Sequence, residues 1–98
     1  MTYTIKLLKE AEKDLSSACE WYEEKQLGLG KKLRLEVDAH LTRIRKNPYL
    51  FQVRFAEVFR FAPLKVFPYL VVYKIKENDK EVIVNAIFHC SRNPEIFE

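Results

Sequence analysis

The chain has 98 residues, of which 48% are hydrophobic and 32% charged, with only two glycines and four prolines. This length predicts one domain over residues 1–98 with a single modest core, and the composition excludes a disordered, collagen-like or repeat protein. No apolar run approaches the roughly 18 residues that cross a bilayer, and the first residues lack a signal-peptide core. We therefore expect a cytoplasmic protein with no membrane partner.

The net charge of +3 is distributed unevenly along the chain. Residues 1–30 sum to −2, residues 31–76 to +8 and residues 77–98 to −3. The basic middle predicts a surface that attracts a polyanion or an acidic protein segment. For the helical half of this stretch, solvated helix faces explain the same charges equally well.

The N-terminal half predicts one strand and two helices. Residues 2–7, TYTIKL, alternate weakly and are rich in β-branched and aromatic side chains, which favours a strand. Apolar residues then recur every three or four positions over 9–25 and 29–46, as they do on one face of a helix. The short QLGLG connection predicts an antiparallel helical hairpin, whose apolar stripes need a sheet to cover them.

The C-terminal half is rich in Phe, Val, Tyr and Ile and predicts strands near 52–61, 66–76 and 81–90. The last two align if Asn78 and Asp79 form the turn, because oppositely charged residues then face each other on either side of it. The predicted fold is therefore α+β: an N-terminal strand and a helical hairpin packed on an antiparallel sheet that ends in a three-stranded meander.

This alignment divides the side chains of the last two strands between two faces. One face is almost wholly apolar and is expected under the helices: Tyr69, Val71, Tyr73, Ile75, Val82, Val84, Ala86 and Phe88. The other face mixes aliphatic and polar groups and is expected to be half exposed: Pro68, Leu70, Val72, Lys74, Ile83, Asn85, Ile87 and His89. Exposed apolar patches of this kind usually mark a partner site.

Several residues carry a resemblance to a known family: Arg60, the FPY of Phe67–Tyr69, Tyr73, and the HxxR of His89 and Arg92. With the order of strand, helical hairpin and meander, they resemble the ParE/RelE toxin superfamily of bacterial type II toxin-antitoxin modules, and the resemblance covers nearly the whole chain. It implies a small toxin, of the kind linked to plasmid stabilization, that a cognate antitoxin neutralises by wrapping around it.

The resemblance leaves two activities open. One branch of the superfamily cleaves mRNA on the ribosome, which requires a general base, a general acid and cations on the phosphate. RelE-like members place paired lysines, an arginine and a C-terminal tyrosine on the exposed sheet, whereas this chain has Leu70 at the arginine position and Phe97 at the tyrosine position. Its motifs are more similar to the ParE-like branch, which poisons DNA gyrase, and that is the first interpretation.

An mRNA interferase is the second interpretation. In that enzyme His89 is the acid or base, Glu57 is its counterpart, and Arg60 and Arg92 hold the phosphate of the mRNA on the ribosome. A lone histidine at the end of a strand is, however, more often structural. The third interpretation is a degenerate module that survives only as an antitoxin-binding or scaffold protein.

Binding of gyrase or of the antitoxin is expected on the half-exposed face and the basic residues near it: Arg54, Arg60, Lys65, Leu70, Val72, Lys74, Ile83, Asn85, Ile87 and Arg92. No metal or other cofactor is expected, because the two histidines and two cysteines show no ligand spacing. The two cysteines are expected to be reduced thiols with a packing role.

Overall fold

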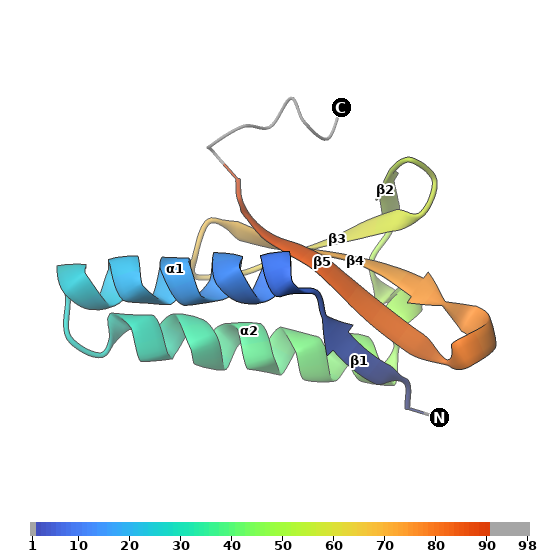
Figure 1. Ribbon diagram of the computed structural model, residues 1–98, viewed down its shortest axis with the longest axis horizontal. Coiled ribbons are helices and arrows are strands. Elements are labelled where there is room, and N and C mark those ends of the chain that lie inside the picture. Colours follow the sequence, from blue (N-terminus) through green and yellow to red (C-terminus); the bar gives the residue numbers. More distant parts are fainter. Residues whose placement is uncertain (1, 91–98) are drawn as a thin grey trace.

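The computed structural model describes residues 2–90 and contains two layers, a helical hairpin and a sheet (Figure 1). The elements are β1 (Thr4–Leu7), α1 (Lys9–Lys25), α2 (Leu29–Lys46), the 3-10 turn η1 (Pro48–Leu50), β2 (Val53–Phe55), β3 (Phe59–Pro63), β4 (Tyr69–Lys76), the 3-10 turn η2 (Glu77–Asp79) and β5 (Glu81–His89). The predicted α+β class and both helices are confirmed. None of the helices in this part of the chain is long and apolar enough to span a membrane.

Two glycines and one carboxylate determine the turn between the helices. Gly28 has a φ of +88°, a conformation that L side chains rarely adopt. A Cβ on Gly30 would lie 2.3 Å from the carbonyl oxygen of Cys19, so only glycine permits this close approach of α2 to α1. The Glu23 carboxylate accepts hydrogen bonds from the N–H of Gly28 (2.7 Å) and of Gly30 (3.0 Å), and these bonds lower its pKa. They also satisfy N–H groups that the start of α2 would otherwise leave unpaired.

The five strands form one mixed sheet in the order β1-β5-β4-β3-β2. Strands β3, β4 and β5 form the predicted antiparallel meander. Strand β1 instead runs parallel to the first half of β5, from Thr4 opposite Glu81 to Leu7 opposite Val84, so the sheet is not wholly antiparallel as expected. The reason is that the helical hairpin returns the chain to the end of the sheet at which β1 begins, before the meander starts (Figure 1).

The predicted strand over residues 52–61 is in fact two strands, β2 and β3, joined by a tight turn. Ala56 and Glu57 take positive φ angles of 53° and 61° in this turn. Side chains other than glycine seldom adopt such angles, and no Asn-Gly or Gly-Gly pair marks the position in the sequence. The rings of Phe55 and Phe59 face each other across the hairpin with centroids 5.9 Å apart.

The β4–β5 hairpin keeps the predicted register only in the half nearest its turn. Lys76 lies opposite Glu81, and the alignment holds as far as Tyr73 opposite Val84. The register then shifts by one residue, with Asn85 as the extra residue of a β-bulge. Strand β4 begins immediately after Pro68, as expected for a residue that cannot donate to the ladder.

Because the bulge adds one residue, every later side chain of β5 changes face. Ile87 and His89 lie on the helix side and Ala86 and Phe88 on the other side, which corrects the prediction for all four. The shift buries Ile87, only 3% exposed, where the smaller Ala86 was expected, and the larger side chain removes more apolar area from water. The carboxylate of Asp14 in α1 accepts the N–H of Ile87 (3.2 Å) beyond the end of β1.

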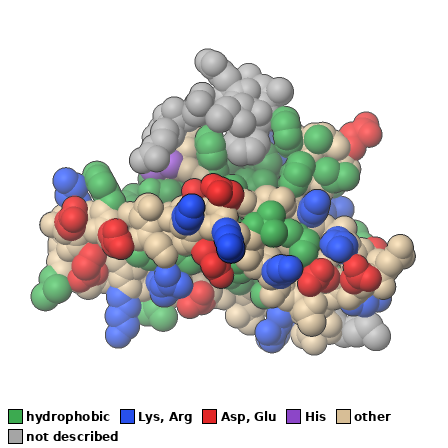
Figure 2. All heavy atoms as spheres, in the orientation of Figure 1, with side chains coloured by type: hydrophobic (Ala, Val, Ile, Leu, Met, Phe, Trp, Pro, Cys, Tyr) green, Lys and Arg blue, Asp and Glu red, His purple; other side chains and the backbone are tan. Residues whose placement is uncertain are grey.

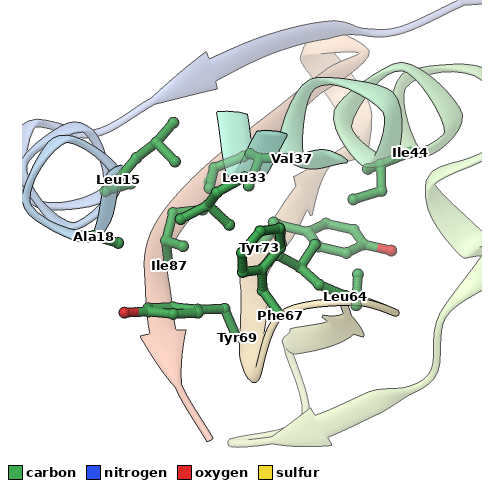
Figure 3. Packing of buried hydrophobic residues seen from close by; sticks show 14 of the residues in the cluster. Leu15, Ala18, Leu33, Val37, Ile44, Leu64, Phe67, Tyr69, Tyr73 and Ile87 are labelled. Atoms are coloured by element: carbon green, nitrogen blue, oxygen red, sulfur yellow. The ribbon is translucent and has the colours of Figure 1, made fainter. Parts of the chain in front are cut away.

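The core lies between the helices and the covered face of the sheet. Figure 3 shows helix residues pointing toward sheet residues across this layer: Leu15 and Ala18 from α1, Leu33 and Val37 from α2, and Tyr69, Tyr73 and Ile87 from the sheet. Tyr73 is fully buried, and its hydroxyl donates to the carbonyl of Pro48 (2.7 Å). Burial raises the pKa of Tyr73 to about 12, so the hydroxyl stays protonated and keeps this bond.

Both cysteines are free thiols, as expected. Cys19 is half-buried, but Cys90 is exposed, so the expected packing role is wrong for Cys90. Desolvation raises the pKa of each thiol, which keeps the thiolate fraction low at neutral pH. Neither cysteine is therefore a candidate nucleophile.

Candidate functional site

The side of the sheet that faces away from the helices is rich in apolar side chains, and we call it the open face. Strand register places these residues on it: Phe55, Phe59, Phe61, Leu70, Val72, Ile83, Ala86 and Phe88. Figure 2 shows hydrophobic side chains gathered around the β2–β3 hairpin at its upper right. Three lysines lie at one end of the face: Lys74 of β4 and Lys6 of β1 both neighbour Ile83, and Lys76 lies opposite Glu81 and forms an ion pair with Asp79.

Four of the predicted binding residues lie on the open face. Leu70 and Lys74 are partly exposed, so a partner can reach them. Val72 and Ile83 are only 3% and 7% exposed, so they offer a partner little surface. The accessible part of the face is therefore its aromatic and leucine side chains with the flanking lysines.

The remaining predicted binding residues are dispersed. Ile87 is in the core, and Asn85 is at the bulge, where its Oδ1 is buried with no hydrogen-bond partner among residues 2–90. Arg54 is exposed on the edge strand β2, and Lys65 is in the β3–β4 loop beside α2. Arg92 lies outside the described residues. The structure therefore does not collect this set on one surface.

Arg60 does not point from the open face. It lies opposite Tyr73 on the helix side of β3. Its Nη1 donates to the carbonyl of Phe51 (2.6 Å), and its guanidinium lies over the ring of Tyr49, 4.9 Å from the centroid. These contacts attach the segment around η1 to the sheet. Glu57 lies in the β2–β3 turn.

His89 is remote from Arg60. It lies opposite Tyr69 at the far end of β4, in an edge-to-face contact with ring centroids 4.9 Å apart. Tyr69 and Tyr73 are four residues apart along β4, which corresponds to about 13 Å in a strand, and Arg60 and His89 lie on opposite sides of β4. Acid, base and phosphate-binding cation must all reach one phosphate, so the described members of the proposed catalytic set do not form one site.

Residues that sequence reasoning did not single out form a polar cluster at the other end of the sheet. Glu77 accepts hydrogen bonds from the hydroxyls of Tyr3 (3.0 Å) and Tyr49 and forms an ion pair with Lys80. The bond from Lys80, followed by the bond from Tyr49, lowers the pKa of Glu77 to about 2. The cluster joins the N-terminus, η1 and the β4–β5 turn. Of these contacts, the sequence indicated only that oppositely charged residues, here Glu77 and Lys80, face each other across the β4–β5 turn.

A groove of about 540 Å³ lies between α1 and the end of β5. Trp21, Tyr22, Tyr69 and His89 are among its lining residues, and Trp21 is 52% exposed. Its aromatic walls suit apolar or planar groups of a partner. Within residues 2–90, no three His, Cys, Asp or Glu side chains gather in the way that metal ligands do.

Comparison with known proteins identifies the fold. Residues 5–94 match the family model described as ParE toxin of type II toxin-antitoxin system, parDE. No curated protein sequence matches the chain.

Solved structures of the same fold come from both branches of the superfamily. The chromosomal ParDE system of P. aeruginosa is 18% identical with a TM-score of 0.75, over 90% of this chain and 96% of that one. The isolated E. coli RelE toxin is 18% identical with a TM-score of 0.72, over 97% and 90%. The E. coli RelBE toxin-antitoxin complex is 17% identical with a TM-score of 0.71, over 92% and 99%. At these identities the likeness establishes the fold and not the target.

Proposed function

This chain belongs to the ParE toxin family of type II toxin-antitoxin systems, and on that premise we propose that it inhibits growth by binding DNA gyrase and not by cutting RNA. One observation favours gyrase binding over RNA cleavage. The open face is largely apolar, whereas Arg60 lies opposite Tyr73 and His89 opposite Tyr69, on opposite sides of β4. A surface of this kind is suited to a protein partner.

The chemistry of the open face supports a protein target. Aromatic side chains such as Phe59, Phe61 and Phe88 are enriched at the centres of protein interfaces, where they contribute much of the binding energy. An RNA-cleaving face needs cations along the phosphate backbone, but the lysines of the open face, Lys6, Lys74 and Lys76, lie only at one end. The face therefore favours binding without hydrolysis.

We propose that a cognate antitoxin covers the same open face. Among the proteins of this fold, E. coli RelBE is a toxin-antitoxin complex. An exposed apolar face is a liability in a free protein, and an antitoxin segment laid over it would protect the face and block the target together. Gyrase and antitoxin then compete for one surface.

The first experiment induces the chain alone in cells and follows thymidine and methionine incorporation in the first minutes. An early fall in thymidine incorporation with methionine unaffected, together with inhibition of gyrase supercoiling by the purified chain, is the expected result. Leu35→Ser is the matched control for the open-face variant Leu70→Ser, because Leu35 is 59% exposed on α2 and away from the open face.

Two other results would each overturn the proposal. An early fall in methionine incorporation with messages cleaved on ribosomes would identify an mRNA interferase. Normal growth without any antitoxin would identify a degenerate binding or scaffold module.

A further inference from the structure

A second groove, of about 340 Å³, lies on the helical side between α2 and the loop that joins β3 to β4. The buried His40 and Phe67 line its floor, and Ala39 lines it from the exposed surface of α2. Phe67 is anchored in the core, and the ring of His40 is buried with its Nδ1 within 3.0 Å of the Glu36 carbonyl. The floor is therefore a fixed, mostly apolar surface.

The rim of this groove is basic. Lys32 and Arg43 reach it from α2, and Lys65 reaches it from the loop. The ion pairs among residues 2–90 are Lys76–Asp79 and Lys80–Glu77, so none of the three rim cations is neutralised in this part of the chain. The rim carries a positive charge available to a partner.

The single acid at the groove, Glu36, is already engaged. Its carboxylate accepts the backbone N–H of Lys65 (2.6 Å) and that of Val66 (3.2 Å). These bonds attach the loop to α2 and hold Lys65 at the rim. Val66 is left 66% exposed beside the apolar floor. Because the loop is already ordered, binding here does not incur the cost of ordering it.

We propose that this groove binds a short acidic peptide segment of a partner protein, with one apolar side chain on the floor and carboxylates facing Lys32, Arg43 and Lys65. Charge complementarity selects an acidic occupant. The apolar floor and exposed Val66 select a peptide over a nucleic acid, whose phosphates gain nothing from an apolar surface. The groove lies on the opposite side of the sheet from the open face and does not depend on the proposed gyrase target.

The test uses a fluorescein-labelled peptide with one phenylalanine flanked on each side by three acidic residues. Fluorescence anisotropy should show saturable binding to the full chain. Lys32→Glu combined with Lys65→Glu should weaken it by about tenfold or more, since two attractions become repulsions. Lys9→Glu combined with Lys13→Glu on α1 changes the net charge equally and should leave binding nearly unchanged.

Two further variants change the apolar lining of the groove without changing a cation. Ala39→Trp fills the groove, and Val66→Asp places an acid at the exposed loop tip; thermal melts verify that each is folded. Both should abolish saturable binding. Binding that survives both, or that the two charge-reversal pairs weaken equally, would show general polyanion attraction and overturn the proposal.

Other occupants would also overturn it. A single-stranded DNA oligonucleotide of equal charge that displaces the peptide equally well would identify a nucleic-acid surface. A dimer in sedimentation experiments that Ala39→Trp dissociates would identify a second copy of the chain as the occupant.

Discussion

The covered face and the open face of the sheet are both apolar, but only one of them is filled by the chain itself. On the covered face Val71, Tyr73 and Val84 are fully buried under the helices. On the open face Leu70 and the neighbouring phenylalanines remain partly exposed. The two helices have one apolar stripe each, enough to cover one face only. The comparison indicates that the first face maintains the fold and the second is available to a partner.

The largest expected effect is on the covered face. Tyr73→Ala removes a fully buried ring and should lower the free energy of unfolding by about 3–5 kcal/mol. Tyr73→Phe keeps the ring but leaves the Pro48 carbonyl without its donor, at a cost of about 1–3 kcal/mol. Urea denaturation measures both. Equal losses for the two variants would show that the hydroxyl, and not the buried ring, maintains this face.

The next effect is at the Glu77 cluster, where the ends of both faces meet. The pKa of Glu77 in the folded chain is about 2, against an ordinary value of 4.5. Its contribution to stability is therefore complete above pH 4.5 and is lost as the pH falls toward 2. Glu77→Gln should lower the Tm at neutral pH and flatten its dependence between pH 4.5 and 2. Thermal melts against pH test this, with Glu20→Gln as the surface control; an unchanged curve would contradict it.

A smaller effect is expected at the bulge, where β5 exchanges its faces. Asn85→Ala removes a buried oxygen that has no hydrogen-bond partner among residues 2–90. An unsatisfied buried acceptor costs about 1–3 kcal/mol, so the variant should match or exceed the parent in stability. Chemical denaturation is sufficient to measure it. A loss of more than about 1 kcal/mol would instead show that the asparagine side chain is needed to form the bulge.

The smallest effect on stability is expected on the open face. Leu70→Ser changes a partly exposed side chain and should alter the free energy of unfolding by no more than about 1 kcal/mol. It should nevertheless reduce growth inhibition and gyrase binding strongly if this face is the contact. Parallel denaturation and toxicity measurements separate the two properties. Full toxicity in a folded Leu70→Ser chain would move the target to another surface.

Part of the candidate site could be predicted from the sequence. Leu70 and Lys74 were placed on the half-exposed face correctly, because both lie on β4, where no extra residue interrupts the alternation of side chains between the two faces. Ile87 and His89 were placed wrongly, because a bulge between them and the turn reverses alternation. No residue pattern around Asn85 predicts that bulge. The sequence did not predict the division of β2 from β3 for a related reason, since Ala56 and Glu57 are not residue types that favour turns.

The sequence by itself determined the two helices, the apolar covered face near the β4–β5 turn and the basic middle of the chain, because periodicity and charge are local properties. Only the tertiary structure decided the face of Ile87, the parallel partner of β1 and the position of Arg60. Those outcomes depend on which side chains the helices can bury and on contacts between residues far apart in the chain. The contact of Glu36 with the loop at the second groove is also tertiary, because Glu36 is separated from Lys65 by 29 positions and from Val66 by 30.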